Sequence, residues 1–264
     1  MRHQKKLDKV TAPAARFQGW KAMPLGSKIA VVVLVALALM AILAPELAPF
    51  KPGQSGLASV EEVVTLDDGT ETNITSQAAP PGGDFIFGTD GSGRDVLSRI
   101  IYGARVSLVV GISATALALA AAVVLGAIAA TGRKWIAEAL MRTLDVVMSF
   151  PGIALAAVLV LALSATLPTL PVVVVSIAVL YVPQLTRVVR ANIISQFGED
   201  YVAASKVMGA SVPWILFKHV ARNCIAPIMV FATVLVADAI VFEASLSFVG
   251  LKKSSRYQGS DDLS

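Results

Sequence analysis

Five long apolar stretches, separated by polar segments, constrain this chain more than any other feature of its sequence. A helix that crosses about 30 Å of hydrocarbon needs about 20 mostly apolar residues. Because no water reaches the backbone amides inside lipid, such a segment satisfies them by forming a helix. The stretches run from residues 28 to 50, about 104 to 131, about 140 to 164, about 170 to 185, and about 225 to 249. They predict an all-α, polytopic membrane protein.

Composition agrees with this fold class and argues against several functions. The chain is 56% apolar and 15% charged, whereas about 25% of the residues in a soluble domain are charged. The single cysteine, Cys224, excludes an internal disulfide, and the two histidines, His3 and His219, lie far apart in the sequence. We therefore expect no metal site in this chain.

The distribution of lysine and arginine predicts sidedness, because short cytoplasmic segments of membrane proteins are rich in both. The tail 1–27 carries six basic residues and one acidic residue, so we expect it in the cytoplasm. The loop 51–103 carries eight acidic and three basic residues and is expected outside, whereas the segment 186–223, with five basic and two acidic residues, returns to the cytoplasm. The polar tail 252–264 breaks the pattern. Either its basic residues are tolerated outside, or the chain has lost a sixth span.

Two local patterns stand out in the loop 51–103. The sequence SVEEVVTLDDGTETNIT places valines before an Asp-Asp-Gly turn, which predicts a small hairpin. The later stretch 87–108 has a turn rich in Gly and Asp, after which Asp95 is expected to cap an interfacial helix. A second interpretation is a cradle for phosphate or a cation, although the turn lacks a Walker lysine and the carboxylate spacing of a calcium loop.

A polar segment, EDYVAASKVMGAS at residues 199–211, lies between the fourth and fifth apolar stretches. Two acidic residues suit the N-terminal end of a helix, and Tyr201, Ala204 and Met208 recur on one face of it. Gly209 is expected to end this helix with a positive φ, and the following Ser-Val-Pro to begin a second short helix. The residues alone leave two interpretations open: a helix that rests on the membrane interface, or a docking helix for a cytoplasmic partner.

The same region and three others resemble one protein family. DYVAASKVMGASVPWILFKHVARN is similar to the cytoplasmic loop of ABC importer permeases of the dipeptide, oligopeptide and nickel type. FGTDGSGRDVLSRIIYGARVSL, MRTLDVVMSFPGIAL and FEASLSFVGL resemble the same branch, in the family's order, and the four cover most of residues 85–251. The resemblance implies the type I ABC importer transmembrane fold, with a first span at 28–50, a permease core over 104–251, and five visible spans of the family's six. The unrelated residues 252–264 lead us to expect that the sixth span was truncated, frameshifted or replaced.

This resemblance implies a permease subunit of an ATP-driven importer in the bacterial inner membrane, which moves di- or oligopeptides into the cell. The implied partners are a homologous permease, two cytoplasmic ATPases that bind ATP and Mg, and an extracytoplasmic solute-binding protein. The resemblance also implies that the subunit itself binds no cofactor and contains no catalytic residue. Nickel chelates and other small ligands remain alternative substrates.

In such permeases a coupling helix fits into a groove of the ATPase. The residues that the resemblance assigns to it here are Asp200, Tyr201, Ala203, Ala204, Ser205 and Gly209. Where the family motif has Glu-Ala-Ala, this chain has Ala203-Ala204-Ser205, so the acidic contact of the motif is missing. Shape is therefore expected to carry more of the docking.

Three charged residues inside the apolar stretches are further candidates, because charge at membrane depth is costly to bury. Asp238 and Glu243 either line a polar route for the substrate, pair with a partner subunit, or make structural contacts in the interior. Asp145, beside Arg142, is expected in a structural ion pair or at the membrane interface. Pro151 is expected to kink its helix at the translocation path. Two other function classes stay open: an ion-coupled secondary transporter that uses Asp238 and Glu243, and a membrane scaffold that transports nothing.

Overall fold

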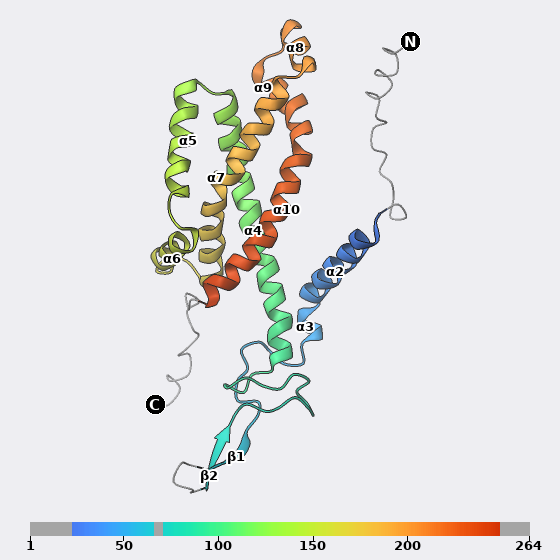
Figure 1. Ribbon diagram of the computed structural model, residues 1–264, viewed down its shortest axis with the longest axis vertical. Coiled ribbons are helices and arrows are strands. Elements are labelled where there is room, and N and C mark those ends of the chain that lie inside the picture. Colours follow the sequence, from blue (N-terminus) through green and yellow to red (C-terminus); the bar gives the residue numbers. More distant parts are fainter. Residues whose placement is uncertain (1–22, 66–70, 249–264) are drawn as a thin grey trace, which may run out of the picture. The chain divides into compact units, whose positions relative to one another are not determined.

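The computed structural model describes residues 23–65 and 71–248, which are helical apart from one hairpin and its connecting loops (Figure 1). The chain divides into two compact units, residues 1–105 and 106–264, and each has its own packing. The tail 252–264 and nearly all of the tail 1–27 lie outside the described residues.

The first unit begins with the apolar helix α2 (Leu25–Ile42), which is followed by the short helix α3 (Ala44–Leu47). Most side chains of α2 are exposed within the chain, as suits a helix that lipid surrounds. The helix begins at Leu25, before the expected start of the span at residue 28, and ends at Ile42, before its expected end at residue 50. It ends at Ile42 because Pro45 has no N–H for a continuing helix and instead occupies the first turn of α3.

A two-stranded antiparallel hairpin follows, as the valine pattern predicts. Strand β1 (Val60–Thr65) pairs with β2 (Glu71–Ser76), with Val60 opposite Ser76 and Thr65 opposite Glu71. The Asp-Asp-Gly turn of the prediction falls in residues 66–70, outside the described part of the chain.

The loop before the second apolar helix ends on a helix cap. A carboxylate oxygen of Asp95 accepts a hydrogen bond from the backbone N–H of Ser98 at 2.7 Å, which confirms the expected cap. The helix that it starts, α4 (Val96–Thr131), is not a separate interfacial helix: it runs unbroken for 36 residues into the second apolar stretch. The sequence between Val96 and Thr131 contains no proline, so nothing in it ends the helix at the membrane surface.

Asp90 organises the turn rich in Gly and Asp. Its carboxylate accepts hydrogen bonds from the backbone N–H groups of Ser92 and Arg94, at 2.9 and 3.1 Å, and from Nε of Arg94 at 3.0 Å. It also forms an ion pair with Arg99. Desolvation by burial raises the pKa of Asp90, but the backbone hydrogen bonds from Arg94 and Ser92 and the charge of Arg94 outweigh it, so the pKa lies below its ordinary value.

This lowered pKa makes the turn sensitive to acid. The ionised carboxylate stabilises the turn above the pKa that Asp90 has in the unfolded chain, and this contribution is lost as the pH falls through the lower pKa of the folded turn. We expect hydrogen exchange of the Ser92 and Arg94 amides, corrected for its intrinsic pH dependence, to be constant near neutral pH and to speed up below about pH 4. Asp90→Asn should exchange at a rate that does not vary with pH. An unchanged wild-type rate down to pH 2 would contradict the assignment.

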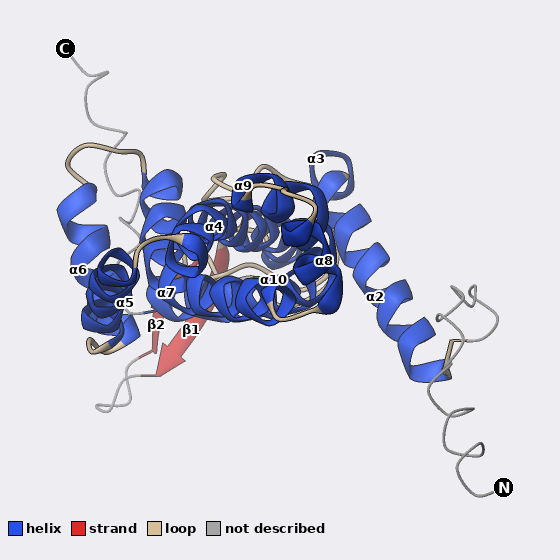
Figure 2. Ribbon diagram, turned by 90° about the horizontal axis from the view of Figure 1, so that it is seen from above, coloured by secondary structure: helices blue, strands red, loops and turns tan. Residues whose placement is uncertain are grey.

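The second unit is a helical bundle around α7 (Thr169–Phe197) and α10 (Ala221–Phe248), which pack along each other. Seen end-on in Figure 2, α4 lies with this pair, whereas α5 (Lys134–Met148) and α6 (Gly152–Leu163) lie outside it, against α7. Three alanines of α4 at a spacing of four, Ala114, Ala118 and Ala122, have no exposed surface. Small residues at this spacing let membrane helices approach closely. The van der Waals contacts of this close packing stabilise helix association in lipid, where the hydrophobic effect does not act between helices.

The third apolar stretch differs from its prediction. The expected single helix over 140–164, kinked at Pro151, is two helices that meet at 93° across a break of three residues. Ser149 caps the end of α5, and Pro151 precedes the first residue of α6. Proline both lacks a donor and disfavours a helical conformation in the residue before it, so it breaks the helix completely here.

The last two apolar helices are longer than predicted. Helix α7 continues twelve residues past the expected end at 185, and Pro183 is buried within it. The fifth helical run starts at Val212 with α9 (Val212–Ile215), passes through the π-helix η2 (Leu216–Val220) and continues as α10, for 37 residues in all. Apolar content alone predicted the ends wrongly, because both helices extend into polar sequence beyond the hydrocarbon.

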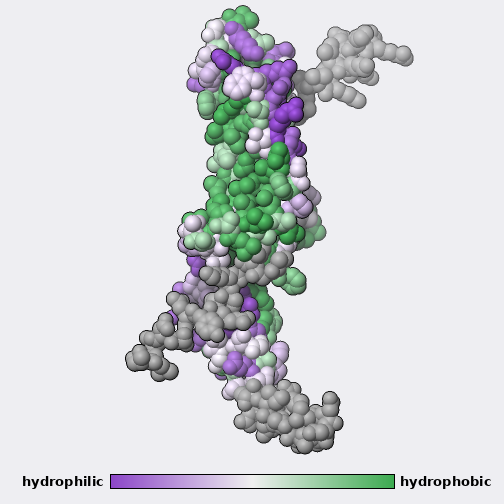
Figure 3. Space-filling model, turned by 90° about the vertical axis from the view of Figure 1, so that its left-hand side faces the viewer, coloured by the Kyte–Doolittle hydropathy of each residue, from purple (hydrophilic) through white to green (hydrophobic). Residues whose placement is uncertain are grey.

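Four helical runs among the described residues are long and apolar enough to cross a membrane, and α5 with α6 makes a fifth if the bent pair counts as one. In Figure 3 the face on the α5 and α6 side of the second unit is hydrophobic across its middle and more polar at the end that carries α8 (Asp200–Val207). This division matches a bundle with its middle in hydrocarbon and α8 in water.

Candidate coupling site

The helix α8 occupies most of the polar segment at 199–211, and a glycine ends it. Gly209 has φ of +84°, as predicted. Its N–H donates to the carbonyl of Lys206 at 2.9 Å, and the N–H of Ala210 donates to the carbonyl of Ser205 at 3.1 Å. These two bonds form a Schellman motif, which satisfies the last carbonyls of α8 and turns the chain sharply towards α9.

The buried face of α8 is formed by Val202 and Ser205. Val202 is fully buried and Ser205 is 6% exposed, whereas Met208, which shares the predicted apolar stripe with Tyr201 and Ala204, is 80% exposed. A polar residue is tolerated on the buried face because the hydroxyl of Ser205 donates to the carbonyl of Tyr201 at 2.8 Å.

Tyr201 ties α8 to both neighbouring long helices. Its hydroxyl donates to the side-chain oxygen of Gln196 near the end of α7 at 2.7 Å, and it accepts from the amide of Asn223 at the start of α10 at 3.2 Å. Its ring also lies edge-on to His219 in η2, with centroids 6.4 Å apart. A side chain that contacts three elements holds α8 at a defined angle to them.

The opposite face of α8 is open. Ala203 and Ala204 are exposed, and Val207 and Met208 are 89% and 80% exposed. Residues three and four apart share a helix face, so Asp200 lies on the same side, one turn before Ala203. We call these five residues the outward face of α8. Its small and flat centre suits close approach by a partner, and it bears one carboxylate, that of Asp200.

Five of the six candidate coupling residues therefore fall into two groups, and the sixth, Gly209, follows the end of α8. Asp200, Ala203 and Ala204 belong to the outward face, whereas Tyr201 and Ser205 are turned inward and position the helix. Sequence reasoning missed Val207 and Met208 as surface residues, because an apolar residue in a membrane protein carries no signal that distinguishes lipid, core and partner contacts.

Asp145 is in an ion pair, although not with the expected residue. Its partner is Arg187 of α7 rather than Arg142, which is its neighbour on α5. The pair joins the α5 arm to the bundle. Pro151 lies at the α5–α6 break and is exposed within the chain.

Asp238 and Glu243 both contact hydroxyl groups of other helices. The hydroxyl of Tyr181 in α7 donates to Asp238 at 2.8 Å, and Ser107 of α4 donates to Glu243 at 3.1 Å. A hydrogen bond from a hydroxyl lowers the cost of a carboxyl group at membrane depth. Asp238 thereby links α10 to α7, and Glu243 links α10 to α4.

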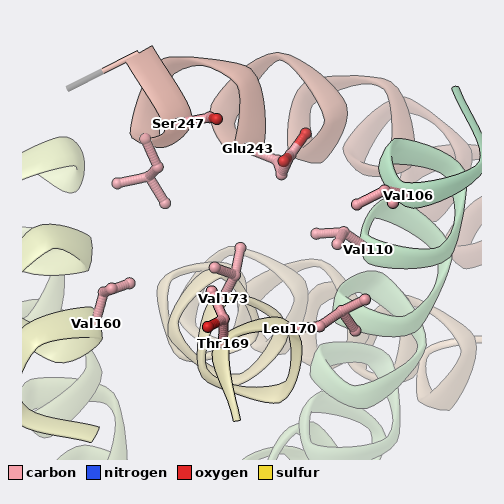
Figure 4. Close-up of a pocket in the computed structure, with 9 residues that line it drawn as sticks. Val106, Val110, Val160, Thr169, Leu170, Val173, Glu243 and Ser247 are labelled. Atoms are coloured by element: carbon pink, nitrogen blue, oxygen red, sulfur yellow. The ribbon is translucent and has the colours of Figure 1, made fainter. Parts of the chain in front are cut away.

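Glu243 also borders a pocket of about 170 Å³ at the end of the bundle opposite α8 (Figure 4). The walls come from α4, α6, α7 and α10, and all of the lining residues except Glu243, Ser247 and Thr169 are apolar. In Figure 4, Glu243 and Ser247 lie on the α10 wall, across from the valines and leucine of α4 and α7. The pocket can accommodate a small apolar group beside one carboxyl.

The Tyr181 contact is expected to stabilise the fold. Tyr181→Phe should lower Tm in detergent, because a hydrogen bond contributes about 0.5–1.5 kcal/mol net to stability and its loss leaves the carboxyl of Asp238 without this donor. Tyr102→Phe is the matched control, since the hydroxyl of Tyr102 makes no hydrogen bond within the described residues. In a double-mutant cycle with Asp238→Asn, the two changes should be non-additive. Additive losses would mean that the two side chains are not coupled.

Comparison with known proteins identifies the family. Residues 122–257 match the family model described as "Binding-protein-dependent transport system inner membrane component". A protein of Brucella suis biovar 1 (strain 1330), named as a peptide transport system permease, is 36% identical over 225 residues, which are 85% of this chain and 69% of that protein. The dipeptide transport system permease protein DppC of Haemophilus influenzae is 34% identical over 232 residues, covering 86% of this chain and 72% of that protein. DppC of Alkalihalophilus pseudofirmus is 37% identical over 195 residues, covering 74% and 63%.

These matches confirm the predicted family and the predicted all-α, polytopic membrane fold. The match at 122–257 contains α8, the α5–α6 break and both intramembrane carboxyl residues. The chain belongs to the inner-membrane components of binding-protein-dependent transport systems, the multi-pass permease subunits of ABC importers.

Proposed function

We propose that this chain is the permease subunit of an importer for di- or oligopeptides, and that partner ATPases drive it through the outward face of α8. The observation that carries the proposal is the mounting of α8. Through Tyr201 it is joined to the end of α7 and to the start of α10, and these two helices pack together through the bundle. A displacement of α8 is therefore passed to both helices.

The proposed mechanism is mechanical. When two ATPases close on ATP, they push on α8, and the bundle changes between inward-open and outward-open states as a rigid body with hinged connections. The Schellman turn at Gly209 and the short α9 let α8 project from the bundle without a flexible linker. Asp200 is the acidic group of the outward face, and we assign to it the contact that the missing glutamate at position 203 would make. ATP and Mg belong to the ATPases, and this subunit performs no bond chemistry.

The sidedness and the partners follow from the same proposal. The basic segment 186–223, and with it α8, faces the cytoplasm, as does the N-terminal tail, whereas the acidic loop 51–103 faces the solute-binding protein or the partner permease. A second, homologous permease completes the transport path. The relatives named for peptide and dipeptide transport support peptides as the substrate class.

The ion-coupled alternative is not favoured. The family is that of binding-protein-dependent transport systems, and the hydroxyl groups that donate to Asp238 and Glu243, at 2.8 and 3.1 Å, give both residues a structural role. The scaffold alternative is not favoured either, because a protein that transports nothing does not need α8 to be held by two membrane helices.

Uptake into vesicles tests the proposal. The chain is reconstituted with its partner permease, both ATPases and the binding protein, and uptake of a labelled dipeptide is followed. We expect uptake with ATP and none with a non-hydrolysable analogue. Uptake driven by an ion gradient in the absence of nucleotide would refute the importer mechanism. ATP-dependent uptake of a nickel chelate but of no peptide would refute the substrate class alone.

A further inference from the structure

A second feature of the second unit has no part in the proposed coupling. A groove of about 520 Å³ lies between α5 and α7. Its lining residues are Met141 from α5 and, from α7, Arg187, Arg190, Ala191, Ile194 and Ser195. It therefore combines two guanidinium groups with apolar walls.

The charge of this groove is positive. Arg187 pairs with Asp145, and Nε of Arg190 donates to the backbone carbonyl of Ala129 at 3.2 Å. Arg190 has no acidic partner within 4.0 Å among the described residues. A guanidinium group carries five N–H donors, so both arginines retain donors for a further acceptor. One carboxylate against two guanidinium groups leaves a net positive site.

The groove lies towards the end of the bundle that carries α8, a position that suits the depth of lipid headgroups. Arg190 precedes the end of α7 at Phe197 by about two helical turns, which is roughly 10 Å along the axis at 1.5 Å per residue. This is the end of the bundle that carries α8, where the apolar surface gives way to polar residues. Trp135, at the start of α5, is 66% exposed, and tryptophan is typical of the membrane interface.

We propose that the α5–α7 groove binds an anionic phospholipid, with its phosphate held by Arg187 and Arg190 and its glycerol and upper acyl chains against Met141 and Ile194. Arginine donates in pairs to phosphate oxygens, and basic pockets between membrane helices bind anionic headgroups. The bound lipid would fill the space between the α5 arm and the bundle. It acts alongside the Asp145–Arg187 pair in holding α5 to α7.

Lipid-dependent stability of the purified, full-length protein tests this proposal. The protein in detergent is titrated with dioleoylphosphatidylglycerol, with dioleoylphosphatidylcholine, and with inorganic phosphate, while Tm is measured and bound lipid is counted by native mass spectrometry. We expect phosphatidylglycerol to bind and to raise Tm, phosphatidylcholine to do so at least tenfold more weakly, and inorganic phosphate to have no effect.

Two variants address the groove by different routes. Arg190→Gln should weaken phosphatidylglycerol binding about tenfold, as expected for a charge-assisted hydrogen bond. Ala191→Glu adds a negative charge to the groove without touching either arginine and should weaken binding to the same extent. Because Ala191 is exposed, this variant keeps the test valid even if Arg190→Gln disturbs the fold. The matched control is Ala139→Glu, at an exposed position of α5 outside the groove lining, which should bind like the wild type.

Three results would overturn the proposal. Equal binding of phosphatidylglycerol and phosphatidylcholine would remove the role of charge. Equal loss in Ala191→Glu and Ala139→Glu would place the lipid elsewhere. Stabilisation by inorganic phosphate alone, abolished in Ala191→Glu, would make this an anion site and not a lipid site.

Discussion

Replacement of Gly126 by leucine is expected to remove most of the folded protein. A Cβ atom at this position would lie 2.6 Å from Cγ1 and 2.8 Å from Cβ of Val189, and 3.2 Å from the backbone nitrogen of Arg190. Val189 is 1% exposed and β-branched, so it has neither space nor an alternative rotamer to move into. Overpacking costs about 1–3 kcal/mol per site, occasionally more. Here the clash also separates α4 from α7 along their contact.

The yield of monodisperse protein after solubilisation, together with Tm, measures this effect. Gly103→Leu is the control on the same helix, because nothing lies within 4 Å of its Cβ position, and it should fold like the wild type. Gly126→Ala is expected to lower Tm less than leucine, and Val189→Ala should partly rescue it by removing the clashing methyl groups. An unchanged Tm for Gly126→Leu would contradict the close approach of α4 and α7 at Gly126 and Val189.

Replacement of Gly209 by valine is expected to abolish transport while leaving the fold of the membrane-embedded helices in place. No atom lies within 4 Å of a Cβ built on Gly209, so the effect does not come from a clash. It comes from the backbone, because φ is +84° and an L-residue pays about 1–2 kcal/mol for a left-handed conformation, most of all a β-branched one. The Schellman turn would open, and α8 would lose its direction relative to α9.

Peptide uptake with ATP and co-purification with the ATPases measure this effect, and both should fall at least tenfold. Gly209→Asn is the matched control, because asparagine tolerates positive φ, and it should retain most of the activity. Tm should stay close to the wild-type value in both variants, since no atom lies within 4 Å of the Cβ position at Gly209. Full uptake in Gly209→Val would show that the direction of α8 is not needed to couple ATP hydrolysis to transport.

Much of the fold was predictable because hydrocarbon imposes strict rules. The apolar stretches correspond to α2, α4, α7 and α10, since an unsatisfied amide in lipid forces a helix whatever the side chains are. The cap at Asp95 and the positive φ at Gly209 were predictable for a similar reason. In both cases a local backbone requirement selects the residue type.

The contacts between helices were not predictable in the same way. The sequence placed Asp145 beside Arg142, but the structure pairs it with Arg187, which lies 42 residues further along the chain. The buried residue of α8 was missed as well, because Val202, which does not belong to the predicted stripe, has no exposed surface. Both features depend on how helices are placed in space, and a periodic pattern within one helix does not name the neighbours of that helix.

By itself, the sequence determined that this chain is a helical membrane protein, which segments are apolar, where the polar segment before the last apolar stretch lies and, through its motifs, the permease family. Only the tertiary structure decided that the third stretch is broken at 93°, that Tyr201 mounts α8 on α7 and α10, and that Arg187 and Arg190 line a groove beside α5. The physical reason is the distance in sequence over which each interaction acts. The requirement that a segment be stable in lipid applies to each segment separately, so it is visible in the composition of that segment. Packing, ion pairs and grooves arise between segments that are far apart in the sequence.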